Sequence, residues 1–172
     1  PTLTNKPANT TSLNGSTYTV SGLVDTQTVV SGSTYAFSGW QVTPGSSIVQ
    51  AGAGIPVTPT PITLTAQWIQ MLNVHYVLNG GTGTYVDSLT ATGTSITVGS
   101  APTRPGYTFA GWTTQSGTSV AASGSLSVDP NNFILYAQWT PINYTVNYVT
   151  NTASTSGSSS ATAISNQVIS LQ

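Results

Sequence analysis

The sequence predicts a β-rich protein built from two small tandem modules and a partial third. An aromatic motif, Tyr35-Ala-Phe37-Ser-Gly39-Trp40, returns 72 residues later as Tyr107-Thr-Phe109-Ala-Gly111-Trp112. Between clusters of Gly, Pro and Asn, β-branched and aromatic residues alternate with polar ones, which is typical of short strands joined by turns. No segment carries apolar residues at the spacing of an amphipathic helix.

A second repeated motif gives the length of the modules. Ile62-Thr-Leu64-Thr-Ala66-Gln67-Trp68 returns 71 residues later as Phe133-Ile-Leu135-Tyr-Ala137-Gln138-Trp139, and the two motifs together contain all four tryptophans. We therefore expect a divergent module at residues 1–71, a well-matched module at 72–143 and a partial third repeat at 144–172. Modules of this size can bury only a modest core.

The second module has the clearest pattern of strands and turns. Val74-His75-Tyr76-Val77-Leu78 alternates in the manner of a half-buried strand. Asn79-Gly80-Gly81 and Asp129-Pro130-Asn131-Asn132 are strong turn signals. Residues 121–128 contain too much Ser and Gly for a helix of more than a turn or two. We expect four strands, at residues 73–78, 94–98, 107–113 and 133–139.

These segments resemble the Listeria–Bacteroides repeat, also called the internalin B-repeat family. The resemblance rests on Val74-His75-Tyr76, on Asn79-Gly80-Gly81, on the run from Ala101 to Trp112, and on Leu135-Tyr136-Ala137-Gln138-Trp139. It covers residues 72–143 and, in part, 33–71. It implies a small β-grasp-like module that occurs in tandem on bacterial surface proteins. The expected fold class is therefore β-rich, either all-β or a β-grasp-like α+β arrangement.

The beginning of the first module has two interpretations. The 72-residue offset places its first strand at the very start of the chain, where Leu3 is the one large apolar residue of Pro1–Lys6. Alternatively, Tyr18–Leu23 is the first strand and residues 1–17 are a leader. Because the chain begins at Pro1 rather than Met, we expect a processed or excerpted start.

Residues 144–172 begin a third copy of the repeat. Tyr144-Thr-Val146-Asn-Tyr148 matches Leu72-Asn-Val74-His-Tyr76, and Val168-Ile169-Ser170-Leu171 resembles a second strand. The aromatic motif that should follow does not occur in this segment. An isolated hairpin is at best marginally stable, so we expect these apolar residues to pack elsewhere. The predicted subunit-contact residues are Tyr144, Val146, Tyr148, Val168, Ile169 and Leu171.

The scarcity of charge excludes several classes of function. Five residues are charged, Lys6, Asp25, Asp87, Arg104 and Asp129, which is 3% of the chain against roughly 25% in ordinary domains. The chain lacks the basic residues that nucleic-acid binding requires. Ser, Thr, Gly and Pro interrupt every apolar run well short of the length of a membrane span. Charged residues normally protect sheet edges from pairing with other chains. The edges in this chain therefore lack that protection.

No catalytic or metal site is predicted, and no cofactor is expected. His75 is the one histidine and should face solvent on its strand, so a Ser-His-Asp triad is not expected. Asp25, Asp87 and Asp129 lie in or near predicted loops, where a turn role is simpler than paired-carboxylate catalysis. Gly80-Gly-Thr-Gly83 has no helix after it to make a phosphate loop and is better explained as a turn.

The repeated aromatic residues allow a core or a sugar-stacking platform. We favour the core, because both modules need the same large apolar anchors at equivalent positions.

Together these observations predict a non-enzymatic, extracellular cell-surface protein. We expect a structural module of a microbial, pilus-like surface filament or an adhesin stalk, in which subunits join head to tail by β-strand addition. The partner would then be another copy of the chain. Alternatively, the chain is an excerpt of a tandem-repeat adhesin that binds a host receptor or glycan.

Overall fold

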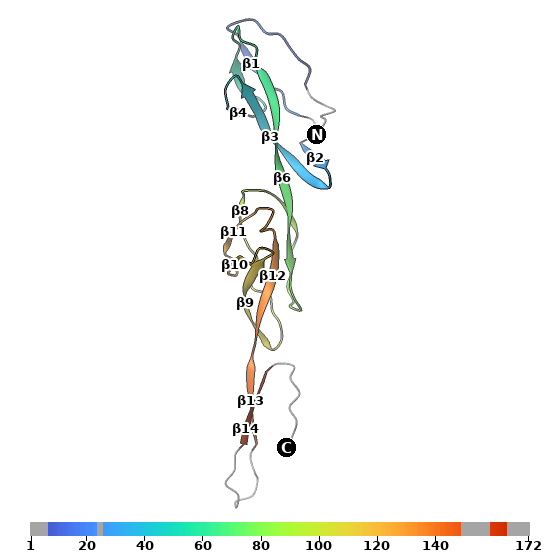
Figure 1. Cartoon of the computed structure of the whole chain (residues 1–172), viewed down its shortest axis with the longest axis vertical. Helices are drawn as coiled ribbons and strands as arrows, with labels where there is room; N and C mark the ends of the chain where they lie inside the picture. The colour runs from blue at the N-terminus through green and yellow to red at the C-terminus, as the bar shows by residue number, and fades with distance from the viewer. Residues whose placement is uncertain (1–6, 24–25, 149–158, 165–172) are drawn as a thin grey trace, which may run out of the picture. The chain divides into compact units, whose positions relative to one another are not determined.

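The computed structural model describes residues 7–23, 26–148 and 159–164 (Figure 1). These residues contain many short strands and no helix, which confirms the β-rich fold class. The chain divides into two units. Unit 1 is Pro1–Leu72 with Leu89–Thr92, and unit 2 is Asn73–Ser88 with Gly93–Gln172.

Unit 1 is organised by one long antiparallel pair of strands. In this pair, β3 faces the first part of β6 from Thr34↔Met71 to Thr43↔Thr63. β2 and β4 pair with β3, and β5 pairs with β1. The bounds are β1 Thr17–Thr19, β2 Gln27–Val30, β3 Ser33–Thr43, β4 Ile48–Val49, β5 Gly54–Pro56 and β6 Thr63–Val77.

Unit 2 uses the last part of β6 as its first strand. His75–Val77 pair in parallel with Ile134–Tyr136 of β12, and β12 pairs antiparallel with β9 along its whole length. β10 pairs with β9 and β11 with β8, while β7, of which Leu89–Ala91 belong to unit 1, pairs with β6. The bounds are β7 Ser88–Ala91, β8 Ser95–Thr97, β9 Tyr107–Thr114, β10 Ser119–Val120, β11 Ser125–Ser127 and β12 Ile134–Pro141.

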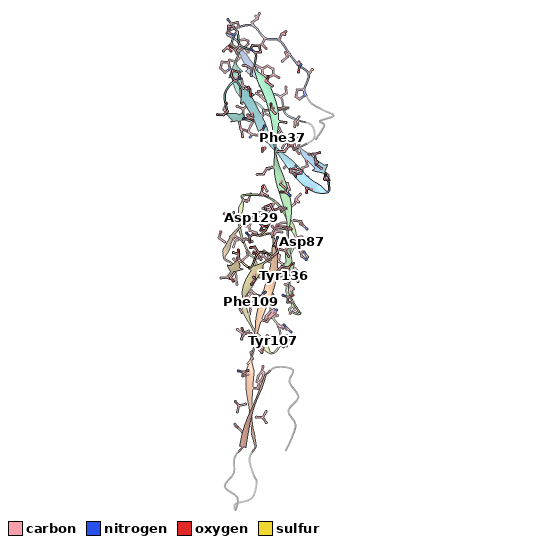
Figure 2. All side chains as sticks on the ribbon, viewed as in Figure 1. Phe37, Asp87, Tyr107, Phe109, Asp129 and Tyr136 are labelled. Carbon is pink, nitrogen blue, oxygen red and sulfur yellow. The ribbon has the colours of Figure 1, made fainter. Side chains whose placement is uncertain are left out.

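The sequence repeat is also a structural repeat. The β3–β4, β1–β5 and β3–β6 pairings of unit 1 correspond to the β9–β10, β8–β11 and β9–β12 pairings of unit 2. Phe37 lies 5.4 Å from Trp40 and 5.7 Å from Trp68 between ring centroids. Phe109, labelled with Phe37 in Figure 2, lies 5.2 Å and 5.6 Å from the two matching tryptophans. Equivalent residues therefore build equivalent cores.

A glycine at a bulge is part of this repeated geometry. The ladder register shifts between Phe37 and Gly39 in unit 1, and between Gln138 and Trp139 in unit 2, opposite Gly111. Gly39 has φ 136° and Gly111 has φ 124°. A Cβ on Gly39 would lie 2.6 Å from the Ile48 side chain. The glycine of each motif is therefore needed by the backbone and by the packing.

Each unit has its own buried core. Trp112 is completely buried and Trp40 is nearly so, whereas Trp68 and Trp139 are half-buried. The indole Nε1 groups of Trp40 and Trp112 each donate a 3.1 Å hydrogen bond, to Ser21 O and Gly99 O respectively. The predicted aromatic core is confirmed for the two fully buried tryptophans.

The structure corrects the interpretation of Tyr18–Leu23. β1 is shorter than this segment and pairs with β5, as β8 pairs with β11. Tyr18 therefore lies in the counterpart of the second strand of the repeat, not of the first. The sequence was misleading because a Tyr-Thr-Val alternation fits either strand. The other candidate, Pro1–Lys6, lies outside the described residues.

The third repeat begins with a two-stranded antiparallel ladder. β13 (Asn143–Tyr148) pairs with β14 (Ser159–Ile164) of the same chain, from Asn143↔Ile164 to Tyr148↔Ser159. The second strand was expected at Val168–Leu171, which lies outside the described residues. Both strands of this hairpin appear in Figure 1.

Candidate functional site

His75 and Asp87 form an exposed hydrogen-bonded contact. His75 Nδ1 lies 2.8 Å and 2.9 Å from the two carboxylate oxygens of Asp87, and Asn73 Nδ2 donates to Asp87 Oδ2 at 3.2 Å. About half of each side chain is exposed, at 49% for His75 and 44% for Asp87. The solvent-facing position of His75 matches the prediction. Its contact with Asp87 was not predicted, because the intervening loop carries no periodic pattern.

Asp129 caps a turn, as predicted. Its carboxylate accepts hydrogen bonds from Asn132 Nδ2 and the Asn131 backbone N–H, both at 2.8 Å. These bonds, with that from the Asn132 side chain contributing most, hold the pKa of Asp129 below its usual value. Asn132 in turn accepts a 2.7 Å hydrogen bond from the buried Thr114 hydroxyl. This network supports the fold and has no catalytic partner.

The described residues contain no group of three or more metal-ligating side chains. Asp25 and Lys6 lie outside the described residues. Asn79 and Gly80 both have positive φ, at 50° and 83°, so the glycine-rich segment is a turn as expected.

An open strand edge in unit 1 is the more informative feature. Val42 faces Leu64 across β3 and β6, and Val42 N–H donates to Ser47 O on the other side of β3. Directly opposed residues in an antiparallel ladder exchange either both hydrogen bonds or none. Leu64 N–H and C=O therefore point away from β3. Among the described residues, no strand pairs with Thr63–Thr65 on that side.

A groove of about 660 Å³ lies beside this edge. Core side chains line it, among them Tyr18, Trp40, Ile55, Ile62 and Leu64. Residues 7–12 form a further part of its wall, and no hydrogen bond joins them to other described residues. The groove therefore combines apolar side chains with backbone groups that no described strand pairs with.

The same position in unit 2 is filled by a strand. Leu135 is the counterpart of Leu64, and the His75 N–H of β6 donates to the Phe133 carbonyl at 3.0 Å. Val74 is 1% exposed, and the Tyr76 ring lies 5.1 Å from the Trp112 ring. The described part of unit 1 has no counterpart to this strand.

Two of the predicted contact residues lie exposed on β13. Tyr144 is 51% exposed and Val146 is 38% exposed, although their counterparts Leu72 and Val74 are buried. Tyr148 lies at the end of β13. Of the remaining predicted residues, Val168, Ile169 and Leu171 lie outside the described residues. The groove residues were not predicted as a site, because the sequence showed them only as core.

Comparison with known proteins identifies the second module. The family model of the Listeria-Bacteroides repeat domain matches residues 73–138. This confirms the resemblance seen in the sequence, and the repeat indicates a surface or extracellular repeat protein. Listeria-Bacteroides repeats are in general structural rather than enzymatic modules.

One relative is a much longer protein. A protein of Evansella cellulosilytica, provisionally named a Gly-rich membrane protein, is 33% identical over 121 residues. The match covers 68% of this chain and 14% of the relative. No solved structure matches the chain. Within the described residues, no helix has the length and apolar character to cross a membrane.

Proposed function

We propose that this chain is an extracellular structural module of a microbial surface filament or adhesin stalk. In this proposal, β-strand addition links the modules of successive subunits. The Listeria-Bacteroides repeat supports the extracellular setting and the structural class. The scarcity of charge supports association, since a net charge of −1 provides almost no repulsion between copies.

A single observation carries the proposal: the described part of the chain has both a groove in unit 1 and an exposed apolar strand, β13. Among the described residues, no strand in the groove of unit 1 corresponds to the strand that unit 2 has there. β13 repeats the sequence of that strand and exposes its apolar residues. Neither Thr63–Thr65 nor β13 carries the charged residues that normally protect a strand edge. Strand addition would cover both surfaces.

Light scattering and negative-stain electron microscopy of the purified full chain test this proposal. We expect the average mass to rise with protein concentration and unbranched fibres to form at high concentration, because a head-to-tail contact does not close. A chain that stays monomeric over the whole accessible concentration range would contradict the proposal.

A second candidate function is binding of a host glycan or receptor by the modules. A recess of about 420 Å³ in unit 2 is lined by Arg104, Tyr107, Phe109 and Trp139 among others. The Arg104 guanidinium lies 3.8 Å from the Tyr107 ring centroid. Aromatic faces beside polar groups suit sugar stacking. Screening the full chain and its Tyr107→Ala variant against a glycan array tests this candidate.

A further inference from the structure

We infer that β13 of one copy enters the groove of unit 1 in a second copy and pairs in parallel with the start of β6. Asn147 of the donor would lie opposite Thr63 of the acceptor. This inference rests on the proposed function and specifies its contact. It follows from unit 2, in which an equivalent strand already occupies the equivalent position.

Unit 2 supplies the register. There, His75 pairs with Ile134 and Tyr76 with Leu135 in a parallel ladder. The sequence repeat maps His75 and Tyr76 onto Asn147 and Tyr148, and it maps Ile134 and Leu135 onto Thr63 and Leu64.

The backbone of the acceptor is oriented for this ladder. Leu64 N–H and C=O point to the open edge, because Val42 turns its own N–H towards Ser47. In unit 2 the His75 N–H donates to the Phe133 carbonyl. By the same pattern, Asn147 N–H would donate to the Ile62 carbonyl, and Leu64 N–H would donate to the Asn147 carbonyl.

The side chains of the donor match the groove. Val146 would take the position of the buried Val74, and Tyr148 that of Tyr76. Tyr76 OH accepts a 3.0 Å hydrogen bond from Gly99 N–H and packs against Trp112. In the acceptor, Trp40 is the counterpart of Trp112, and the backbone of Ser21 is the counterpart of that of Gly99.

The pairing of β13 with β14 is compatible with this role. The strand β6 pairs with β12 in unit 2 and also with β7, and the Thr92 N–H donates to Gln70 O. Gln70 and His75 lie five residues apart on β6, so their backbone groups point to opposite edges of the strand. A strand can therefore have a hairpin partner on one edge and a parallel partner on the other. Within the described residues, β14 is the one strand paired with β13.

Mixed cysteine cross-linking tests the inference, and the natural chain contains no cysteine to interfere. The full-length Thr63→Cys chain is mixed with the full-length Asn147→Cys chain under mild oxidation. We expect a disulfide-linked heterodimer, since opposed strand residues lie within the Cα spacing that a disulfide requires. A Val29→Cys acceptor is the matched control, because Val29 is 67% exposed on β2, away from the groove. It should give only background dimer.

A change on each face of the donor sharpens the test. Adding Val146→Asp to the Asn147→Cys chain should abolish the heterodimer, because a carboxylate would enter the apolar groove. Adding Thr145→Asp places the same charge on the opposite face of the strand and should leave most of the heterodimer.

The outcomes separate the inference from the proposed function. If the natural chain associates but the Thr63/Asn147 pair cross-links no better than the Val29/Asn147 pair, the inference is wrong and the proposed function stands. If a chain carrying both Thr63→Cys and Asn147→Cys forms only an internal disulfide, the second copy is excluded as the occupant. If the natural chain never associates, both fail.

Discussion

Trp112 contributes most to the packing of unit 2. It is completely buried, and three aromatic rings surround it, those of Tyr76, Tyr85 and Phe109, at 5.1 to 5.3 Å between centroids. Its indole N–H is bonded to Gly99 O. Loss of this side chain would remove packing and one of the two hydrogen bonds that Gly99 O accepts, the other coming from the Ser123 N–H.

Replacing Trp112 by Ala should therefore lower the free energy of unfolding of unit 2 by about 3–5 kcal/mol. Urea titration followed by circular dichroism measures the loss. Tyr144→Ala removes a side chain that is 51% exposed and should change the unfolding midpoint little. Equal losses for the two variants would contradict the assigned core.

Asp129 makes stability depend on pH in a defined direction. Its pKa is held below the usual value of 3.8, so its contribution is present above pH 3.8 and is lost as the pH falls through the lower, folded pKa. We expect Asp129→Asn to lower the melting temperature at neutral pH. The difference from the natural chain should vanish near pH ~2. A difference that persists in acid would exclude the carboxylate as its cause.

Residue-scale predictions from the sequence succeeded where the repeat supplied a second copy. Trp40 and Trp112 were expected in the core because both modules carry them. The pairing of His75 with Asp87 had no such signal. Asp87 lies in a loop whose course depends on packing rather than on local pattern.

The bulge glycine is the clearest feature at the scale of the element. Gly39 needs a positive φ and also lies too close to Ile48 and Val49 to carry a Cβ. Gly32, in the turn between β2 and β3, also has a positive φ, but a Cβ added there would meet nothing within 4 Å.

Gly39→Ala should destabilise unit 1 more than Gly32→Ala does. The Gly32 variant incurs only the left-handed backbone cost, about 1–2 kcal/mol, while the Gly39 variant adds a steric clash. Thermal unfolding of the two variants and the natural chain gives the comparison. Equal destabilisation would mean that the close packing at the bulge contributes nothing.

Element prediction depended on strand length. The strands at β6, β8, β9 and β12 were expected from alternation. β4, β5, β10 and β11 were not, since two or three residues are too few to show a period of two. Of the two interpretations of the first strand of unit 1, the one at Tyr18–Leu23 was wrong, because it depends on which strand Tyr18 pairs with.

At the scale of the whole molecule, the repeat explains both the folded modules and the unpaired surfaces. In unit 2, the last part of β6 pairs in parallel with the last strand, β12. In the described part of unit 1 a groove lies at that place, and no described strand fills it. The sequence predicts a third repeat that begins at Tyr144. It could not show the groove, which requires the direction of the backbone groups at Leu64.

Association through this contact should be nearly independent of ionic strength. Neither the groove nor β13 carries a charged residue, so there is little for salt to screen. Sedimentation velocity at low and high sodium chloride measures the association constant. A steep loss of association in high salt would point to an electrostatic interface and against strand addition.

Amide hydrogen exchange at Leu64 tests the central claim most directly. The full-length Val146→Asp chain serves as a non-donating acceptor, with and without a synthetic peptide of residues 142–150. With the peptide at 100 times its Kd, the account predicts that Leu64 exchange slows by about 100-fold. The amide of Val29 on β2 should be unaffected. Unchanged exchange at Leu64 with the peptide bound would contradict the account.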